Sequence, residues 1–307
     1  MRTVFAKTLK KLMKKNKDVI VITADMGYSV LEEIQKEFPK RIINTGITEQ
    51  NSISLATGLA LSGFKVFLYA QAVFITMRCF EQVRLDIAYN QVDVKLIGPT
   101  AGLSLNQLGV SHFATNDIAL MRTLPTMTIL SPGDPYEAEW AVNTAYKTKG
   151  PVYLRLTNKG SEPIHQHKLS LPLGKSIKIK NGKDASLFVT GGLLKQAVKL
   201  FSYLGKKGIN ISLFSIPTIK PLDCKTILNE AKKTGNIYSL EEHDITGGLG
   251  SSIAEILAES NIKANFLRFG IPNHFLSVTG SLDYLLSEEC SLSCEKMSQI
   301  IISRFKG

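Results

Sequence analysis

Short apolar runs alternate with amphipathic helical patterns along the first half of the chain. The run at 18–25, DVIVITAD, is apolar throughout its middle and ends in polar residues, which is typical of a buried parallel strand. Similar runs predict strands at 41–46, 65–70, 94–99, 127–132 and 151–157, and helical periodicity predicts helices at 3–16, 50–62, 74–88 and 135–148. This alternation favours an α/β fold with a mainly parallel sheet.

The same alternation restarts after a polar, lysine-rich connection. Strands are predicted at 185–192, 209–216 and 236–243, and helices at 194–207, 223–234 and 250–259. We therefore expect two doubly wound α/β domains with mainly parallel sheets, at 1–160 and 184–307, joined by a linker at 161–183. In such folds the functional loops follow the carboxyl ends of the strands.

The composition is that of an ordinary globular protein, with 44% hydrophobic and 21% charged residues among 307. Because no apolar run reaches the roughly 18 residues that span a bilayer, we expect no membrane association. The N-terminal segment has no apolar core of the kind that a secretory signal needs, so the expected location is cytoplasmic. The four cysteines are scattered, which favours reduced thiols and no metal site.

The formal net charge of +11 comes largely from lysine-rich segments near the start and around residue 175. We find no basic and aromatic module of the kind that binds nucleic acid, so we expect no such binding. The positive charge instead favours attraction of an anionic substrate or an acidic partner chain.

One acid, Glu49, stands alone between Arg41 and Lys65. It follows a predicted strand and precedes small and apolar positions, so we expect it at the carboxyl edge of the sheet. The spacing alone leaves two interpretations open. Glu49 is either an exposed acid that favours the helix dipole, or a single acid in a dry pocket, placed there for proton chemistry.

Several motifs, in order along nearly the whole chain, resemble the transketolase family. They are GITEQN at 46–51, FITMRCFEQVR at 74–84, TAGLSLNQLGVSHFATNDIALMR at 100–122, FSIPTIKPLD at 214–223 and EEHDITGGLGSSIAEILAE at 241–259. In particular, the chain is similar to the C-terminal subunit of a split transketolase, which carries the pyrimidine-binding domain and the C-terminal domain. The resemblance implies a transferase that moves a two-carbon ketol unit between sugar or sugar phosphate substrates with thiamine diphosphate and Mg²⁺.

The resemblance assigns cofactor contacts to Asp25, Glu49, Phe74, Met77 and Phe80. Glu49 matches the family's catalytic glutamate, which bonds the aminopyrimidine ring and favours the tautomer that accepts a proton from the thiazolium. Phe74, Met77 and Phe80 recur every three residues and match an apolar wall for that ring, although core packing explains the same spacing. Asp25 matches an acid near the cofactor.

Substrate contacts are implied by further matches to the family. His112 matches the catalytic histidine near the reacting end of the donor, and Arg2 and Ser29 match positions that bind a sugar phosphate. The family's second phosphate-binding arginine aligns with Asn158. Lys159, next to it, supplies a point charge but no bidentate fork.

Two positions depart from the family pattern. Thr100 replaces a histidine of the substrate site, and Leu108 replaces an aspartate that reads a donor hydroxyl. Since a site that loses polar partners loses discrimination for those groups, we expect a donor other than, or broader than, the usual ketose phosphates. A 2-oxo acid decarboxylating component, similar to deoxyxylulose-phosphate synthase or to the β chain of a 2-oxo acid dehydrogenase, stays an alternative. So does a non-catalytic assembly subunit.

The family's diphosphate and metal motif, GDG followed by an asparagine, does not occur in this sequence. The resemblance therefore implies an N-terminal partner subunit that holds the diphosphate and most of the Mg²⁺ coordination. With the cofactor site shared between chains, we expect an α2β2 heterotetramer.

Overall fold

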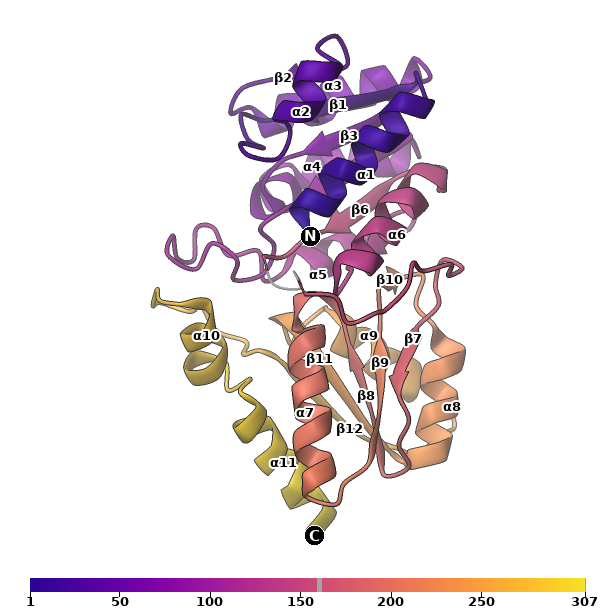
Figure 1. Cartoon of the computed structure of the whole chain (residues 1–307), viewed down its shortest axis with the longest axis vertical. Helices are drawn as coiled ribbons and strands as arrows, with labels where there is room; N and C mark the ends of the chain where they lie inside the picture. Colours follow the sequence, from indigo (N-terminus) through magenta and orange to yellow (C-terminus); the bar gives the residue numbers. More distant parts are fainter. Residues whose placement is uncertain (159–161, 307) are drawn as a thin grey trace.

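The computed structural model describes residues 1–158 and 162–306, which form two stacked α/β units (Figure 1). The upper unit contains the N-terminus and the lower one the C-terminus. Among the described residues, no helix has both the length and the apolar character needed to cross a membrane.

The first sheet has the strand order β10-β5-β6-β4-β3-β1-β2, and its strands run parallel except where β10 pairs with β5. Its strands are β1 (Val19–Thr23), β2 (Ile42–Asn44), β3 (Lys65–Tyr69), β4 (Val94–Gly98), β5 (Thr128–Leu130), β6 (Val152–Arg155) and β10 (Thr218–Lys220). The helical segments of this half are α1 (Arg2–Lys15), α2 (Glu32–Glu37), α3 (Glu49–Leu61), η1 (Phe74–Arg78), α4 (Phe80–Gln82), η2 (Val83–Tyr89), α5 (Asp117–Arg122) and α6 (Pro135–Lys147).

The second sheet has the order β12-β11-β8-β9-β7, with β7 antiparallel to β9 and the other pairs parallel. Its strands are β7 (Ile177–Lys180), β8 (Ala185–Val189), β9 (Ile211–Ser215), β11 (Asn236–Asp244) and β12 (Asn265–Ile271). The helical segments are η3 (Gly191–Leu193), α7 (Leu194–Lys206), α8 (Cys224–Thr234), α9 (Leu249–Ala258), α10 (Leu282–Tyr284), η4 (Leu285–Glu289) and α11 (Cys294–Lys306). The expected fold class, two α/β units with mainly parallel sheets, is confirmed.

Both sheets are covered on two faces because neighbouring strand residues point to opposite sides. In β1, Val21 packs with α1 and α6 residues, whereas Ile22 packs with residues of α3 and the π-helical turns. In β8, Phe188 belongs to the same core cluster as Ile22, while Leu187 packs under α7. One apolar cluster thus continues from the first sheet into the second, so the two halves share a core.

Two short strands cross the boundaries expected from the sequence. β7 lies within 161–183, the segment predicted to be a linker, and forms an edge of the second sheet. Its isoleucines alternate with exposed lysines, which gave the segment a solvated character in the sequence. β10 lies in the second half of the chain but joins the first sheet. The domain limits themselves stay a prediction.

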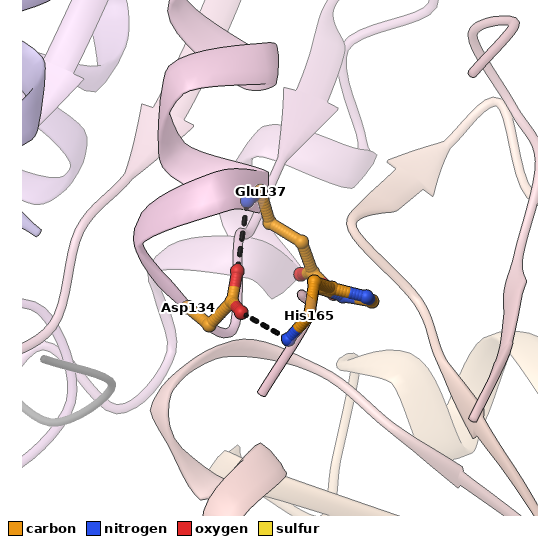
Figure 2. Close-up of side chains that lie close together, drawn as sticks. All are labelled: Asp134, Glu137 and His165. Atoms are coloured by element: carbon orange, nitrogen blue, oxygen red, sulfur yellow. Dashed lines mark hydrogen bonds and ion pairs between the residues drawn. The ribbon is translucent and has the colours of Figure 1, made fainter. Parts of the chain in front are cut away.

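The connection between the halves is fastened to the start of α6 by a buried polar cluster (Figure 2). Asp134 caps α6 by accepting a hydrogen bond from the Glu137 backbone N–H, and its other oxygen accepts from the N–H groups of Ile164 and His165, at 2.8 and 2.9 Å. His165 Nε2 lies 2.8 Å from Glu137 Oε1. The three side chains are close enough to hold a metal ion, but these hydrogen bonds account for the cluster as a fastening of the connection.

Asp134→Ala is expected to lower the free energy of unfolding by about 2 kcal/mol, because the variant loses a helix cap and leaves buried N–H groups without an acceptor. Urea denaturation of both proteins measures this difference. Ser281→Ala is the matched control, since Ser281 caps α10 at an exposed position, and there we expect about 0.5 kcal/mol or less. Equal losses for the two variants would contradict this account of the cluster.

Candidate functional site

Glu49 is the first residue of α3 and follows the carboxyl end of β2. Its side chain is only 5% exposed, and its Oε2 lies 3.0 Å from Nη1 of Arg78. The burial rules out the interpretation of Glu49 as a surface acid at a helix start. A buried carboxylate needs a partner, and Arg78 provides one from the facing π-helical turn η1.

Arg78 connects Glu49 to two aromatic rings. Its guanidinium lies 4.2 Å from the centre of the Phe74 ring, and the Phe74 ring meets the His112 ring edge to face, with centroids 5.3 Å apart. Four residues, Glu49, Phe74, Arg78 and His112, therefore form one continuous group, which we call the Glu49 cluster. The sequence alone indicates no site role for Arg78, because a lone arginine in a helical pattern carries no sign of its partner.

The negative charge of Glu49 is also felt by its neighbour Cys79. Burial, and then the Glu49 charge, raise the pKa of the Cys79 thiol to about 12. Cys79 therefore stays a neutral thiol within the apolar core under the helix. This leaves Glu49 and Arg78 as the charged pair of the Glu49 cluster.

Phe74, Met77 and Phe80 do not share one environment. Phe74 and Met77 pack against the same small cluster of alanine and valine side chains, whereas Phe80 packs on the main core and lines a separate pocket with Leu85 and Tyr89. The cause is the π-helical turn, in which Cys79 N–H bonds to the Phe74 carbonyl five residues back. A wider turn breaks the three-residue spacing, so the place of Phe80 in a cofactor wall stays a prediction.

The loop at 99–116 brings His112 to the Glu49 cluster and is held by the second sheet. Glu242 accepts a hydrogen bond from Leu103 N–H at 2.9 Å, and Asp244 N–H donates to the Thr115 carbonyl at 2.7 Å. Gly102 has a φ of +65°, and a Cβ there would lie 2.5 Å from Glu242 Oε1. The tight contact between this loop and β11 thus requires glycine.

The two departures from the family pattern lie on the same loop. Thr100 is buried in the left-handed region, and its hydroxyl lies 3.0 Å from Gln71 Oε1. Leu108 is 54% exposed at the far end of the loop. Asn158 joins the loop from β6 by donating its side-chain N–H to the Ser104 carbonyl. Lys159 lies outside the described residues.

Asp25, Ser29 and Arg2 lie near the carboxyl ends of β1 and β3. Asp25 and Ser29 both have positive φ, at 48° and 59°, a conformation that is rare outside glycine and is found at functional turns. Asn44 bonds the backbone and side chain of Asp25. Burial raises the pKa of Tyr69 to about 12, although the Arg2 charge beside it acts in the opposite direction. The structure shows no direct contact of these residues with the Glu49 cluster.

Comparisons with known proteins agree with the motifs. The model of the transketolase pyrimidine-binding domain matches residues 1–161, and that of the transketolase C-terminal domain matches 174–288. A putative transketolase C-terminal section from Methanocaldococcus jannaschii is 33% identical over 100% of this chain and 96% of that protein. One of the two subunits of an apulose-4-phosphate transketolase from Phocaeicola vulgatus is 34% identical over 89% of this chain and 87% of its own length.

Among solved structures, a split gene transketolase in the form of an inactive beta4 tetramer superposes with a TM-score of 0.88. It is 30% identical, and the match covers 98% of this chain and 96% of that one. The domain matches follow the order predicted from the motifs, and the match to these relatives extends over both halves. The chain therefore belongs to the transketolase family, and within it to the subunits that carry the pyrimidine-binding and C-terminal domains.

Proposed function

We propose that this chain is the C-terminal subunit of a two-subunit transketolase that transfers a two-carbon ketol unit between sugar substrates. The observation that carries the proposal is the buried carboxylate of Glu49, which lies at the carboxyl edge of a parallel sheet beside an aromatic ring and a histidine. Single acids in such a position serve proton transfer, and ligands of doubly wound sheets bind at this edge.

The Glu49 cluster fits the aminopyrimidine part of thiamine diphosphate. Phe74 offers a ring face, and the Arg78 guanidinium, a planar group with N–H donors, already occupies that face while it bonds Glu49. Arg78 is 47% exposed, so it has room to withdraw into solvent. The cofactor supplies an activated thiazolium carbon that attacks carbonyl groups. In this chain Glu49 would hold a proton at the pyrimidine ring, and His112 would orient the reacting end of the substrate.

The Glu49 cluster supplies a single carboxylate, whereas Mg²⁺ requires about six oxygen ligands. We therefore assign the diphosphate and the metal mainly to an N-terminal partner subunit, with two copies of each chain in an α2β2 assembly. The similarity to a transketolase C-terminal section, and to one subunit of the apulose-4-phosphate transketolase, supports a partner of this kind. A cytoplasmic location fits an enzyme of sugar phosphates.

The substrate end of the site supports a donor outside the usual ketose phosphates. The Thr100 hydroxyl is bonded to Gln71 inside the protein, and Leu108 presents an apolar group where the family has an aspartate. Arg2 and Ser29, with Lys159, remain our candidates for a phosphate group. One relative acts on apulose 4-phosphate, according to its name, which shows that subunits of this kind serve unusual sugars.

Glu49→Gln is expected to reduce turnover of the assembled enzyme by about 10²- to 10⁴-fold, because an amide cannot exchange a proton with the cofactor. Steady-state ketol transfer by the co-purified pair measures the effect, and size-exclusion chromatography checks the assembly. Glu81→Gln is the matched control, since Glu81 is exposed on the neighbouring α4. Unchanged turnover of Glu49→Gln would support a non-catalytic assembly subunit instead.

Titration calorimetry tests the shared cofactor site. We expect thiamine diphosphate with Mg²⁺ to bind tightly to the pair of subunits, and at least about 100-fold more weakly to this chain alone, since the metal ligands come from the partner. Equal affinity for the chain alone and the pair would overturn the division of the site between two subunits.

A panel of donors separates the two catalytic interpretations. The assembled enzyme is offered pyruvate, xylulose 5-phosphate and apulose 4-phosphate, each with an aldehyde acceptor. We expect ketol transfer from a sugar donor. Decarboxylation of pyruvate without ketol transfer would assign the chain to the 2-oxo acid branch.

A further inference from the structure

A cavity of about 470 Å³ lies between the two halves, on the other side of the loop that carries His112. The first half lines it with Met77, Phe113 and Asn116, and the second half with Asp244, His274 and Phe275. A cavity of this size is within the range of small-molecule sites, which often form where domains meet. The second-half residues of this cavity have no part in the cofactor chemistry of the Glu49 cluster.

The cavity adjoins the Glu49 cluster through two residues. Met77 packs with Phe74 on the same small apolar cluster, and Val110, which also lines the cavity, is two residues from His112. A substrate whose reacting end lies at His112 therefore has a path into the cavity along the wall formed by Met77.

The polar atoms of the cavity are mainly hydrogen-bond acceptors. Asn116 Oδ1 is buried and has no hydrogen-bond partner among the described residues, although Asn116 stands at the start of α5. Burial raises the pKa of the Asp244 carboxyl to about 6, against a hydrogen bond from Thr115. A buried acceptor without a partner is unfavourable, and a ligand that donates O–H groups removes that penalty.

The same acceptors disfavour an anion. A phosphate beside an amide oxygen and a carboxylate meets repulsion, whereas sugar hydroxyls donate to both. Apolar side chains, among them Met77, Phe113 and Ile271, form the remaining walls and suit the C–H faces of a sugar. Phe275 is 85% exposed and lies at the mouth of the cavity.

We propose that this cavity binds the uncharged, hydroxyl-bearing end of a sugar substrate, with Asn116 and Asp244 as the residues that select it. The inference rests on the proposed function for its link to catalysis. It gives the C-terminal half a direct part in substrate choice, and it separates a hydroxyl-reading subsite from the phosphate position assigned to Arg2 and Ser29. It also offers a second place for the discrimination lost at Thr100 and Leu108.

The first test measures binding to the full chain without cofactor or partner. Saturation-transfer NMR is run with D-fructose, D-ribose and D-glucose, and with inorganic phosphate as a competitor. We expect saturation transfer to at least one of the neutral sugars, with no displacement by phosphate. Absence of transfer to all three sugars, or displacement by phosphate, would overturn the proposal.

Asn116→Leu is the diagnostic variant. It replaces an unpartnered buried acceptor by an apolar group of similar size, so the free energy of unfolding should stay the same or rise. The dissociation constant of the bound sugar should increase by roughly tenfold, the effect of one lost hydrogen bond. Asp244→Asn should weaken binding in the same direction, while Glu259→Gln, at an exposed position on the C-terminal side of α9, should leave it unchanged. Unchanged sugar binding by Asn116→Leu would overturn the role of this residue.

The second test uses the assembled enzyme with its best sugar donor and acceptor. Asn116→Leu should raise KM for one of them by about tenfold and leave kcat within about twofold, because the residue touches the non-reacting end. An unchanged KM for both would overturn the substrate role of the cavity. Failure of ketol transfer itself would instead refute the proposed function, and the binding result for the free chain would still stand.

Discussion

The arrangement of both halves depends on one buried ion pair, between Asp117 at the start of α5 and Arg155 at the end of β6. The two side chains are 0% and 1% exposed, and Arg155 Nε lies 2.8 Å from Asp117 Oδ2. The Tyr153 hydroxyl donates to the same oxygen, and Arg155 also donates to the Glu242 carbonyl of β11. Losing either member would leave an unpaired charge in the core, at a cost of about 3–5 kcal/mol.

This pair fixes the position of the loop at 99–116 because it binds both ends of its surroundings. Asp117 begins the helix that follows the loop, and Arg155 ends the strand beside β4, from which the loop leaves. Glu242, whose carbonyl Arg155 holds, bonds the loop again at Leu103. His112 therefore reaches the Glu49 cluster through contacts that the second half supplies. The C-terminal half acts in this way as a structural support of the site.

Features with a strong local pattern were predictable from the sequence. Buried strands such as β1 follow from continuous apolar runs, and Glu49 is distinguished by its isolation among uncharged residues. The three-residue β10 has no such pattern, since its place is decided by pairing with a strand of the other half. Phe80 was assigned to one face with Phe74 because periodicity assumes an α-helix, and the π-helical turn changes that spacing. Arg78 was missed because its importance comes from contacts with residues 29 positions away.

The Glu49–Arg78 pair explains how a chain with half of a site remains stable before it is completed. A buried carboxylate without a counter-ion would be unfavourable, and Arg78 supplies that counter-ion while its guanidinium lies over Phe74. Any planar ligand that stacks on Phe74 and bonds Glu49 must displace the guanidinium. Because Arg78 is half exposed, its charge can be rehydrated at little expense, whereas Glu49 at 5% exposure cannot be. The acid thus keeps its place in the fold, and the exposed partner is the member of the pair that is free to move.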